Sequence, residues 1–187
     1  MSMRKVNDEV FYLENSTILV GREETEFLKE KVGANGRKRI RLCAHKGLED
    51  PVHEMFVTLT KESYVRPHKH ISKSESFHLI EGSIDLVIFD EVGNVVDVIP
   101  LADRASGGNF YFRFTQPAYH TVCVTSDVVL FHETTSGPFQ KSDTLFAPWS
   151  PPEDDQSAVR RFMDLLASAI GSRTRHLGAL AGKESRS

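Results

Sequence analysis

Short segments with the spacing of β-strands fill the middle of this chain and follow one another at regular intervals. Within them, Val, Ile, Phe and Tyr alternate with polar residues, and turn-forming clusters such as Glu91-Val92-Gly93-Asn94 separate them. We predict strands at residues 37–45, 53–60, 64–70, 75–80, 83–90, 95–101, 110–115, 120–125 and 128–134. About eight or nine short strands with turns between them predict an all-β sandwich or barrel.

Helical patterns lie on both sides of this β region. Residues 22–32 carry apolar side chains at helical spacing, with acidic residues first and lysines last. Prolines at 148–152 end the β pattern because proline lacks the N–H that a β-ladder needs, and an apolar helical stripe follows at 156–170. We therefore expect an N-terminal strand/helix extension packed on the barrel (1–36), the barrel (37–152), a C-terminal helix (153–171) and a mobile tail (172–187).

Composition excludes several classes of protein. The 187 residues carry a formal net charge of −3, which argues against a nucleic-acid binder that relies on bulk positive charge. The longest apolar run, Leu86–Phe89, is far below the roughly 20 residues that a membrane span requires. The N-terminus lacks the apolar segment of a secretory signal, so we expect a cytoplasmic protein without nucleic-acid or membrane partners. Cys43 and Cys123 are predicted to be buried, reduced thiols.

One stretch carries the residues of a metal site. His68 and His70 are two residues apart on a predicted strand, so both imidazoles point to the same face. Glu75 begins the next strand after a short turn, and Gly82 ends that strand where a tight turn is needed. Two histidines and a carboxylate hold first-row metal ions and leave coordination positions open. His120, at the start of a distant strand, could supply a third histidine.

The spacing from His68 to Gly82 resembles the first motif of the cupins, which is His-x-His, four residues, Glu, six residues and Gly. The second cupin motif is degenerate here, because Gly108, Pro117 and His120 are present but a second glycine and the final asparagine are missing. The resemblance implies a small antiparallel β-barrel, the cupin jelly roll. It also implies a metal ion held by His68, His70, Glu75 and His120.

About residues 37–152 are similar to the WbuC-type cupin fold metalloproteins. The segments that carry this similarity include Arg39-Ile40-Arg41 with His45, Tyr64–His68, Lys73–Phe77, His120-Thr121, Glu133 with Gly137–Phe139, and Ala147–Pro151. That family is associated with surface-polysaccharide gene clusters. The resemblance therefore implies a role in polysaccharide biosynthesis and a substrate that is sugar-like or sugar-acid-like.

Further polar residues are candidates for contact with a substrate. Arg39, Arg41 and His45 share one strand face, which is either solvated or lines the barrel mouth and binds an anionic ligand. If the histidines point inward, Tyr64 and Arg66 point inward on the same strand. We therefore take the three arginines and His45 as candidate substrate-binding residues, and Tyr64 as a candidate catalytic residue.

The turn at residues 125–127 decides which side chain of the last predicted strand faces the site. A three-residue loop would place His132 beside His120, and a two-residue loop would place Glu133 there, because a slip of one residue turns every side chain to the other face. The sequence pattern leaves both open. The WbuC-type resemblance favours Glu133, which could act as a catalytic general base.

Together these features predict a metal-binding cupin, with an isomerase, hydrolase or Fe(II) dioxygenase activity on a small oxygen-rich substrate. The cofactor would be one divalent transition metal, and the ligand set allows Fe, Mn, Ni, Zn or Cu. A non-catalytic cupin that binds or senses a small molecule through its metal is an alternative, and so is a purely structural cupin. The expected partners are an anionic or polyhydroxylated small molecule and, through a sheet edge or face, a second copy of the chain.

Overall fold

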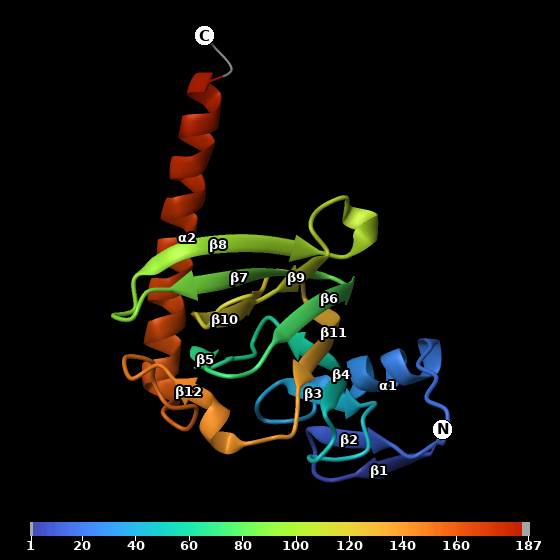
Figure 1. Cartoon of the computed structure of the whole chain (residues 1–187). Coiled ribbons are helices and arrows are strands. Elements are labelled where there is room, and N and C mark those ends of the chain that lie inside the picture. Colours follow the sequence, from blue (N-terminus) through green and yellow to red (C-terminus); the bar gives the residue numbers. More distant parts are fainter. Residues whose placement is uncertain (1, 185–187) are drawn as a thin grey trace.

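The computed structural model describes residues 2–184, and the side chains of residues 2–173. Two β-sheets face each other, with one helix packed on the outside of each sheet (Figure 1). Helix α1 spans Arg22–Val32 and α2 spans Gln156–Glu184. Single turns of 3-10 helix lie at Arg104–Ser106 and Lys141–Asp143.

The larger sheet has seven strands among the described residues. In spatial order these are β1 (Met3–Lys5), β2 (Val10–Leu13), β3 (Arg39–Cys43), β4 (Val52–Thr60), β11 (Val128–Ser136), β6 (Glu75–Glu81) and β9 (Tyr111–Arg113). Strands β2 and β3 pair in parallel, and the other neighbours pair antiparallel. The N-terminal strands therefore extend the barrel sheet itself.

The smaller sheet has five strands in the described part of the chain. In spatial order these are β12 (Thr144–Phe146), β5 (His68–His70), β10 (Tyr119–Val124), β7 (Ser83–Phe89) and β8 (Val95–Ala102), all antiparallel. The two sheets form a cupin-type jelly roll. The predicted fold class, an all-β barrel with an N-terminal and a C-terminal helix, is confirmed.

The barrel core lies between the sheets, and the outer faces are buried where helices cover them. On β7, Ile84 and Leu86 point into the barrel, and Val87 and Phe89 point to the opposite face, which packs against α2. Both faces of β7 are therefore buried, which explains its continuous apolar sequence. Helix α1 packs on β3 in the same way, and the inner face of β3 is left for polar residues.

The structure differs from the sequence prediction at several elements. Residues 64–67 are not part of a strand, because β5 begins at His68. The predicted hairpin at 125–127 is wrong, since β10 and β11 belong to different sheets and do not pair. The short strands β1, β2 and β12 had not been predicted as separate elements.

The C-terminal helix is longer than the 153–171 segment predicted from the sequence. Helix α2 continues to Glu184, through most of the segment for which a mobile tail was predicted. Residues 185–187 of that predicted tail lie outside the described residues. Within residues 2–184, no helix is both long enough and apolar enough to cross a membrane.

Both cysteines are free thiols, as predicted. Burial raises the pKa of Cys43 to about 11 and that of Cys123 to about 12. Both thiols are therefore protonated near neutral pH and are poor nucleophiles.

Gly82 occupies a turn that only glycine fits. Its φ is +80°, and a Cβ there would lie 2.4 Å from the carbonyl oxygen of Val128. We expect Gly82→Ala to lower the free energy of unfolding by about 2–4 kcal/mol, from left-handed strain and the clash together. Gly107→Ala is the matched control, because Gly107 has a φ of +77° but no atom within 4 Å of the added Cβ. Urea unfolding should show a clearly smaller loss for Gly107→Ala, and equal losses would contradict the clash.

Candidate metal centre

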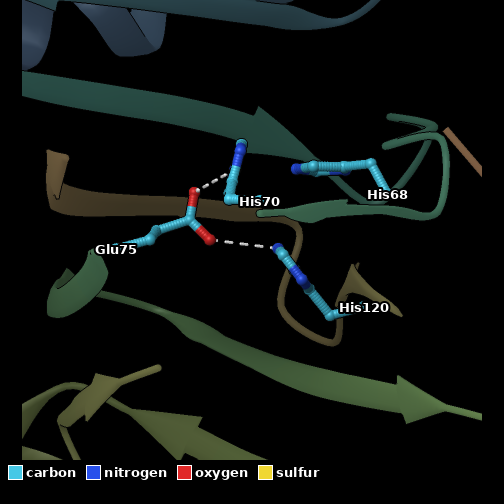
Figure 2. Close-up of side chains that lie close together, drawn as sticks. All are labelled: His68, His70, Glu75 and His120. Atoms are coloured by element: carbon cyan, nitrogen blue, oxygen red, sulfur yellow. Dashed lines mark hydrogen bonds and ion pairs between the residues drawn. The ribbon is translucent and has the colours of Figure 1, made fainter. Parts of the chain in front are cut away.

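Three strands from both sheets bring four side chains together. Strand β5 contributes His68 and His70, and His120 on β10 pairs directly with His68. Glu75 is the first residue of β6 in the opposite sheet. The potential ligand atoms of these four residues all lie within 4.8 Å of one another. Figure 2 shows the four side chains pointing toward a common point.

Hydrogen bonds to backbone carbonyl groups orient two of the three imidazole rings. Nδ1 of His68 lies 2.8 Å from the carbonyl oxygen of Arg66, and Nδ1 of His120 lies 3.0 Å from that of Ala118. A carbonyl oxygen can only accept, so both Nδ1 atoms donate, and in a neutral ring Nε2 keeps its lone pair. In metalloproteins, hydrogen bonds of this kind orient the histidines that bind the metal ion.

Glu75 lies between two of the histidines. Its Oε1 is 3.2 Å from Nε2 of His70, and its Oε2 is 3.0 Å from Nε2 of His120. Although that second pair lies within ion-pair distance, Oε2 of Glu75 and Nε2 of His120 are buried and have no hydrogen-bond partner. Buried polar atoms without partners are rare and mark strain, a functional role or a bound ion. The four residues therefore fit a divalent metal ion.

The electrostatics of the group also suit a cation. Burial lowers the pKa of His68 to about 4, so its imidazole is neutral near pH 7. Burial opposes the charge of Glu75, but its close contacts with His120 and His70 outweigh burial and hold the pKa of this carboxyl group well below its usual range. Burial likewise opposes the charged form of His70, but its contact with Glu75 raises the pKa. A buried charged carboxylate thus lies among imidazole nitrogens.

The group lies in a cavity of about 820 Å³. Residues that line this cavity include Arg39, Arg41, His45, Arg66 and Glu133 besides the four potential ligands. The basic face of β3 therefore lines the cavity, and its binding of an anionic ligand stays a prediction.

Tyr64 is not brought to this cavity. Its hydroxyl donates a hydrogen bond to the carbonyl oxygen of Pro151 at 2.9 Å, and its ring contacts Phe162 of α2. Burial raises its pKa to about 12. The proposed inward direction assumed strand alternation through residues 64–70, and this fails because the strand begins only at His68.

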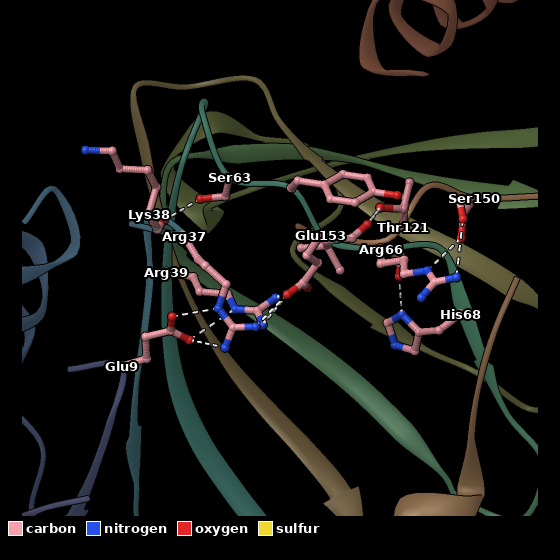
Figure 3. A network of polar contacts seen from close by, with 12 residues as sticks. Glu9, Arg37, Lys38, Arg39, Ser63, Arg66, His68, Thr121, Ser150 and Glu153 are labelled. Atoms are coloured by element: carbon pink, nitrogen blue, oxygen red, sulfur yellow. Dashed lines mark hydrogen bonds and ion pairs between the residues drawn. The ribbon is translucent and has the colours of Figure 1, made fainter. Parts of the chain in front are cut away.

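Two of the candidate arginines are engaged by the protein itself (Figure 3). Arg39 contacts Glu153 at 2.9 Å and Glu9 at 3.4 Å, and Arg37 binds the same two carboxylates. Arg66 donates to Oγ of Ser150 at 3.1 Å and to its carbonyl oxygen at 3.3 Å. The charge of Arg39 is therefore compensated before any ligand binds.

Arg41 and His45 differ in how far their side chains are held by contacts within the protein. The Arg41 guanidinium contacts the sulfur of Met55 at 4.0 Å, and within residues 2–173 it has no ion pair. His45 is buried, stacks on His53 at 4.2 Å, and hydrogen-bonds through Nδ1 with the backbone of Glu54. Arg41 is thus the better placed of the two to bind an anion.

Strand β11 points Glu133 into the cavity and His132 away from it. His132 contacts the ring of Phe56 and lies 3.9 Å from Glu54 on the outer side of the sheet. Burial and the charge of Glu75 raise the pKa of Glu133 to about 7. A carboxyl group that titrates near neutral pH is suited to proton transfer.

The contribution of β12 to the site was not predicted from the sequence. Thr144 pairs with His70 and places its Oγ1 3.2 Å from Nδ1 of that histidine. Phe146 pairs with His68 and lines the cavity. A three-residue strand has too few residues to show a periodicity, and only the run Thr144-Leu145-Phe146 before Pro148 could have signalled it.

Thr144→Val is expected to weaken metal binding about tenfold or more while the fold stays intact, because the valine cannot hydrogen-bond to Nδ1 of His70. Competition with a chelating dye would measure the dissociation constant. Thr134→Val, on the outward side of β11, is the matched control and should bind metal as the wild type does. Unchanged affinity in Thr144→Val would show that the contact does not hold His70.

The fold and the site together define a cupin-type jelly roll with a His3Glu group that could hold a metal ion. A family model described as Domain of unknown function (DUF6016) matches residues 21–101, which include His68, His70 and Glu75. No curated protein sequence matches the chain.

Three solved structures illustrate what the backbone is similar to. They are a protein from Shewanella oneidensis (15% identity, TM-score 0.44, 55% of this chain and 66% of that one), Bacillus subtilis oxalate decarboxylase (16%, 0.40, 53% and 24%) and the Schizosaccharomyces pombe Cnp3 cupin domain (12%, 0.38, 53% and 64%). The chain spans less than two thirds of the length of each. Similarity this distant says nothing about substrate or reaction.

Proposed function

We propose that this protein is a metal-dependent cupin enzyme that acts on a small, oxygen-rich, anionic substrate of the sugar or sugar-acid type. One observation carries the proposal: the His3Glu group, the unpaired Arg41 and the carboxyl group of Glu133 line the same cavity. The WbuC-type resemblance of residues 37–152 supports the sugar-like character of the substrate.

Each group would have a distinct part in the reaction. His68, His70, Glu75 and His120 would hold the metal, which when bound would polarise a carbonyl or hydroxyl group or lower the pKa of water. Arg41 would bind the carboxylate of the substrate, since a guanidinium matches a carboxylate in a bidentate pair. Glu133 would accept or return a proton as general base or acid.

Turnover of sugar acids tests this function. Protein reconstituted separately with Fe(II), Mn(II), Ni(II) and Zn(II) would be incubated with hexuronates and aldonates and followed by proton NMR. We expect conversion with at least one metal and none after chelation. Glu133→Gln should lower kcat about a hundredfold or more with unchanged metal content. Glu54→Gln, an exposed glutamate next to His132, should leave kcat unchanged.

Two results would contradict the proposal in different ways. Binding of a sugar acid without any conversion would show a ligand-binding cupin instead of an enzyme. Conversion that continues after complete removal of the metal by a chelator would show that the reaction does not require a metal.

A further inference from the structure

An aromatic side chain lies next to the histidines of the candidate metal centre. Phe146 on β12 pairs directly with His68 on β5, and the centres of the two rings are 6.3 Å apart. Directly paired residues on neighbouring strands point to the same face of a sheet. Both side chains therefore face the cavity.

This ring is exposed, unlike the aromatic residues deeper in the barrel. Phe146 leaves 50% of its surface exposed, whereas Phe77 and Phe131 expose 4% and 2%. Ligand pockets are lined by apolar and aromatic side chains with a few placed polar groups. An exposed phenyl ring in the wall of such a cavity is therefore a surface that a ligand could cover.

The ring is held in place from one side. Cζ of Arg66 lies 4.8 Å from the ring centre of Phe146, and Ser150 fixes the Arg66 guanidinium through two hydrogen bonds (Figure 3). The strand pairing of β12 with β5 fixes the backbone beneath it. Half of the residue remains exposed, so part of its surface is free to contact a ligand.

We propose that Phe146 is a stacking platform that selects ring-shaped over open-chain sugar acids. The apolar C–H face of a pyranose would pack on the phenyl ring while the carboxylate of the same ligand lies toward the metal centre and Arg41. An open-chain acid of the same length has no such flat face, so it would gain little from the platform. This inference rests on the proposed function and narrows its substrate class to cyclic uronic acids.

Calorimetric titration of the Zn(II)-loaded protein with D-glucuronate and D-gluconate tests the platform. The two probes have equal numbers of carbon atoms and one carboxylate each, but only glucuronate forms a pyranose ring. We expect the wild type to bind glucuronate more tightly. Phe146→Leu should weaken glucuronate binding about fivefold to tenfold and leave gluconate binding nearly unchanged.

Three controls make the result specific. Phe146→Tyr keeps the ring and should retain the preference for glucuronate. Phe110→Leu removes an aromatic ring that is 38% exposed and packs beside His78, outside the cavity, and should change neither affinity. Zinc content and circular dichroism of each variant would show that the site and the fold are intact.

The outcomes separate the inference from the function on which it rests. If both acids bind the loaded wild type and Phe146→Leu affects them equally or not at all, the platform is overturned and the proposed function stands. If neither acid binds the wild type loaded with Fe(II), Mn(II), Ni(II) or Zn(II) in turn, the proposed function fails and the platform fails with it.

Discussion

Leu86→Ala is expected to lower the free energy of unfolding by about 3–5 kcal/mol, because it removes buried methyl groups and leaves a cavity. Leu86 is fully buried at the centre of the barrel core, among side chains from both sheets. Because both faces of β7 are packed, the surrounding residues can move little to fill the cavity that the substitution leaves. Guanidinium unfolding followed by circular dichroism measures the loss.

Leu165→Ala is the control for this substitution. Leu165 lies on α2 and is 72% exposed, so its truncation should change stability by no more than about 0.5 kcal/mol. A loss for Leu86→Ala as small as that of Leu165→Ala would contradict the position of Leu86 in the core between the two sheets.

Binding of a divalent metal should stabilise the folded protein strongly. At a free metal concentration about a thousandfold above Kd, the expected gain is about 4 kcal/mol, provided that the unfolded chain does not bind the ion. The expected stabilisation follows from Glu75 and His120, because their buried atoms without hydrogen-bond partners would bind the metal only in the folded state. The measurement is Tm of chelator-treated protein with and without each metal.

The double variant His68→Ala, His70→Ala is the control for metal stabilisation. It removes two of the potential ligands, so the metal should leave its Tm unchanged. An equal rise of Tm in the wild type and in this variant would place the metal elsewhere on the molecule.

The metal centre was largely predictable because most of it is local in sequence. His68 and His70 follow from the period of a strand, and Glu75 follows after one short turn. No local pattern links His120 to them: the residues made it only a candidate third histidine, and the resemblance to cupins placed it among the ligands. The structure brings all four together.

The surroundings of the site were less predictable, because they depend on contacts between distant segments. The direction of Tyr64 depended on where β5 begins, and its hydrogen bond to Pro151 joins segments far apart in the chain. Glu133 faces the cavity because β11 pairs with β4 and β6. The length of the 125–127 loop could not decide this, because β10 and β11 lie in different sheets and form no hairpin. Polysaccharide biosynthesis, cytoplasmic location and pairing with a second copy stay predictions.

The compensation of the Arg39 charge was not predictable from the sequence either. Glu9 and Glu153 come from opposite ends of the chain and meet at the cavity only in the folded protein. The pattern of basic residues indicated one basic strand face, but it left open whether that face is solvated or lines the cavity. It could not show which arginine keeps its charge free for a ligand.

Elemental analysis of the purified protein tests the central claim most directly. Chelator-treated wild type would be reconstituted separately with Fe(II), Mn(II), Ni(II) and Zn(II), desalted, and compared with the His68→Ala, His70→Ala variant. We expect about one equivalent of at least one metal in the wild type and none in the variant, with equal circular dichroism spectra. A folded wild type that retains none of the four metals would contradict the assignment of His68, His70, Glu75 and His120 as a metal centre.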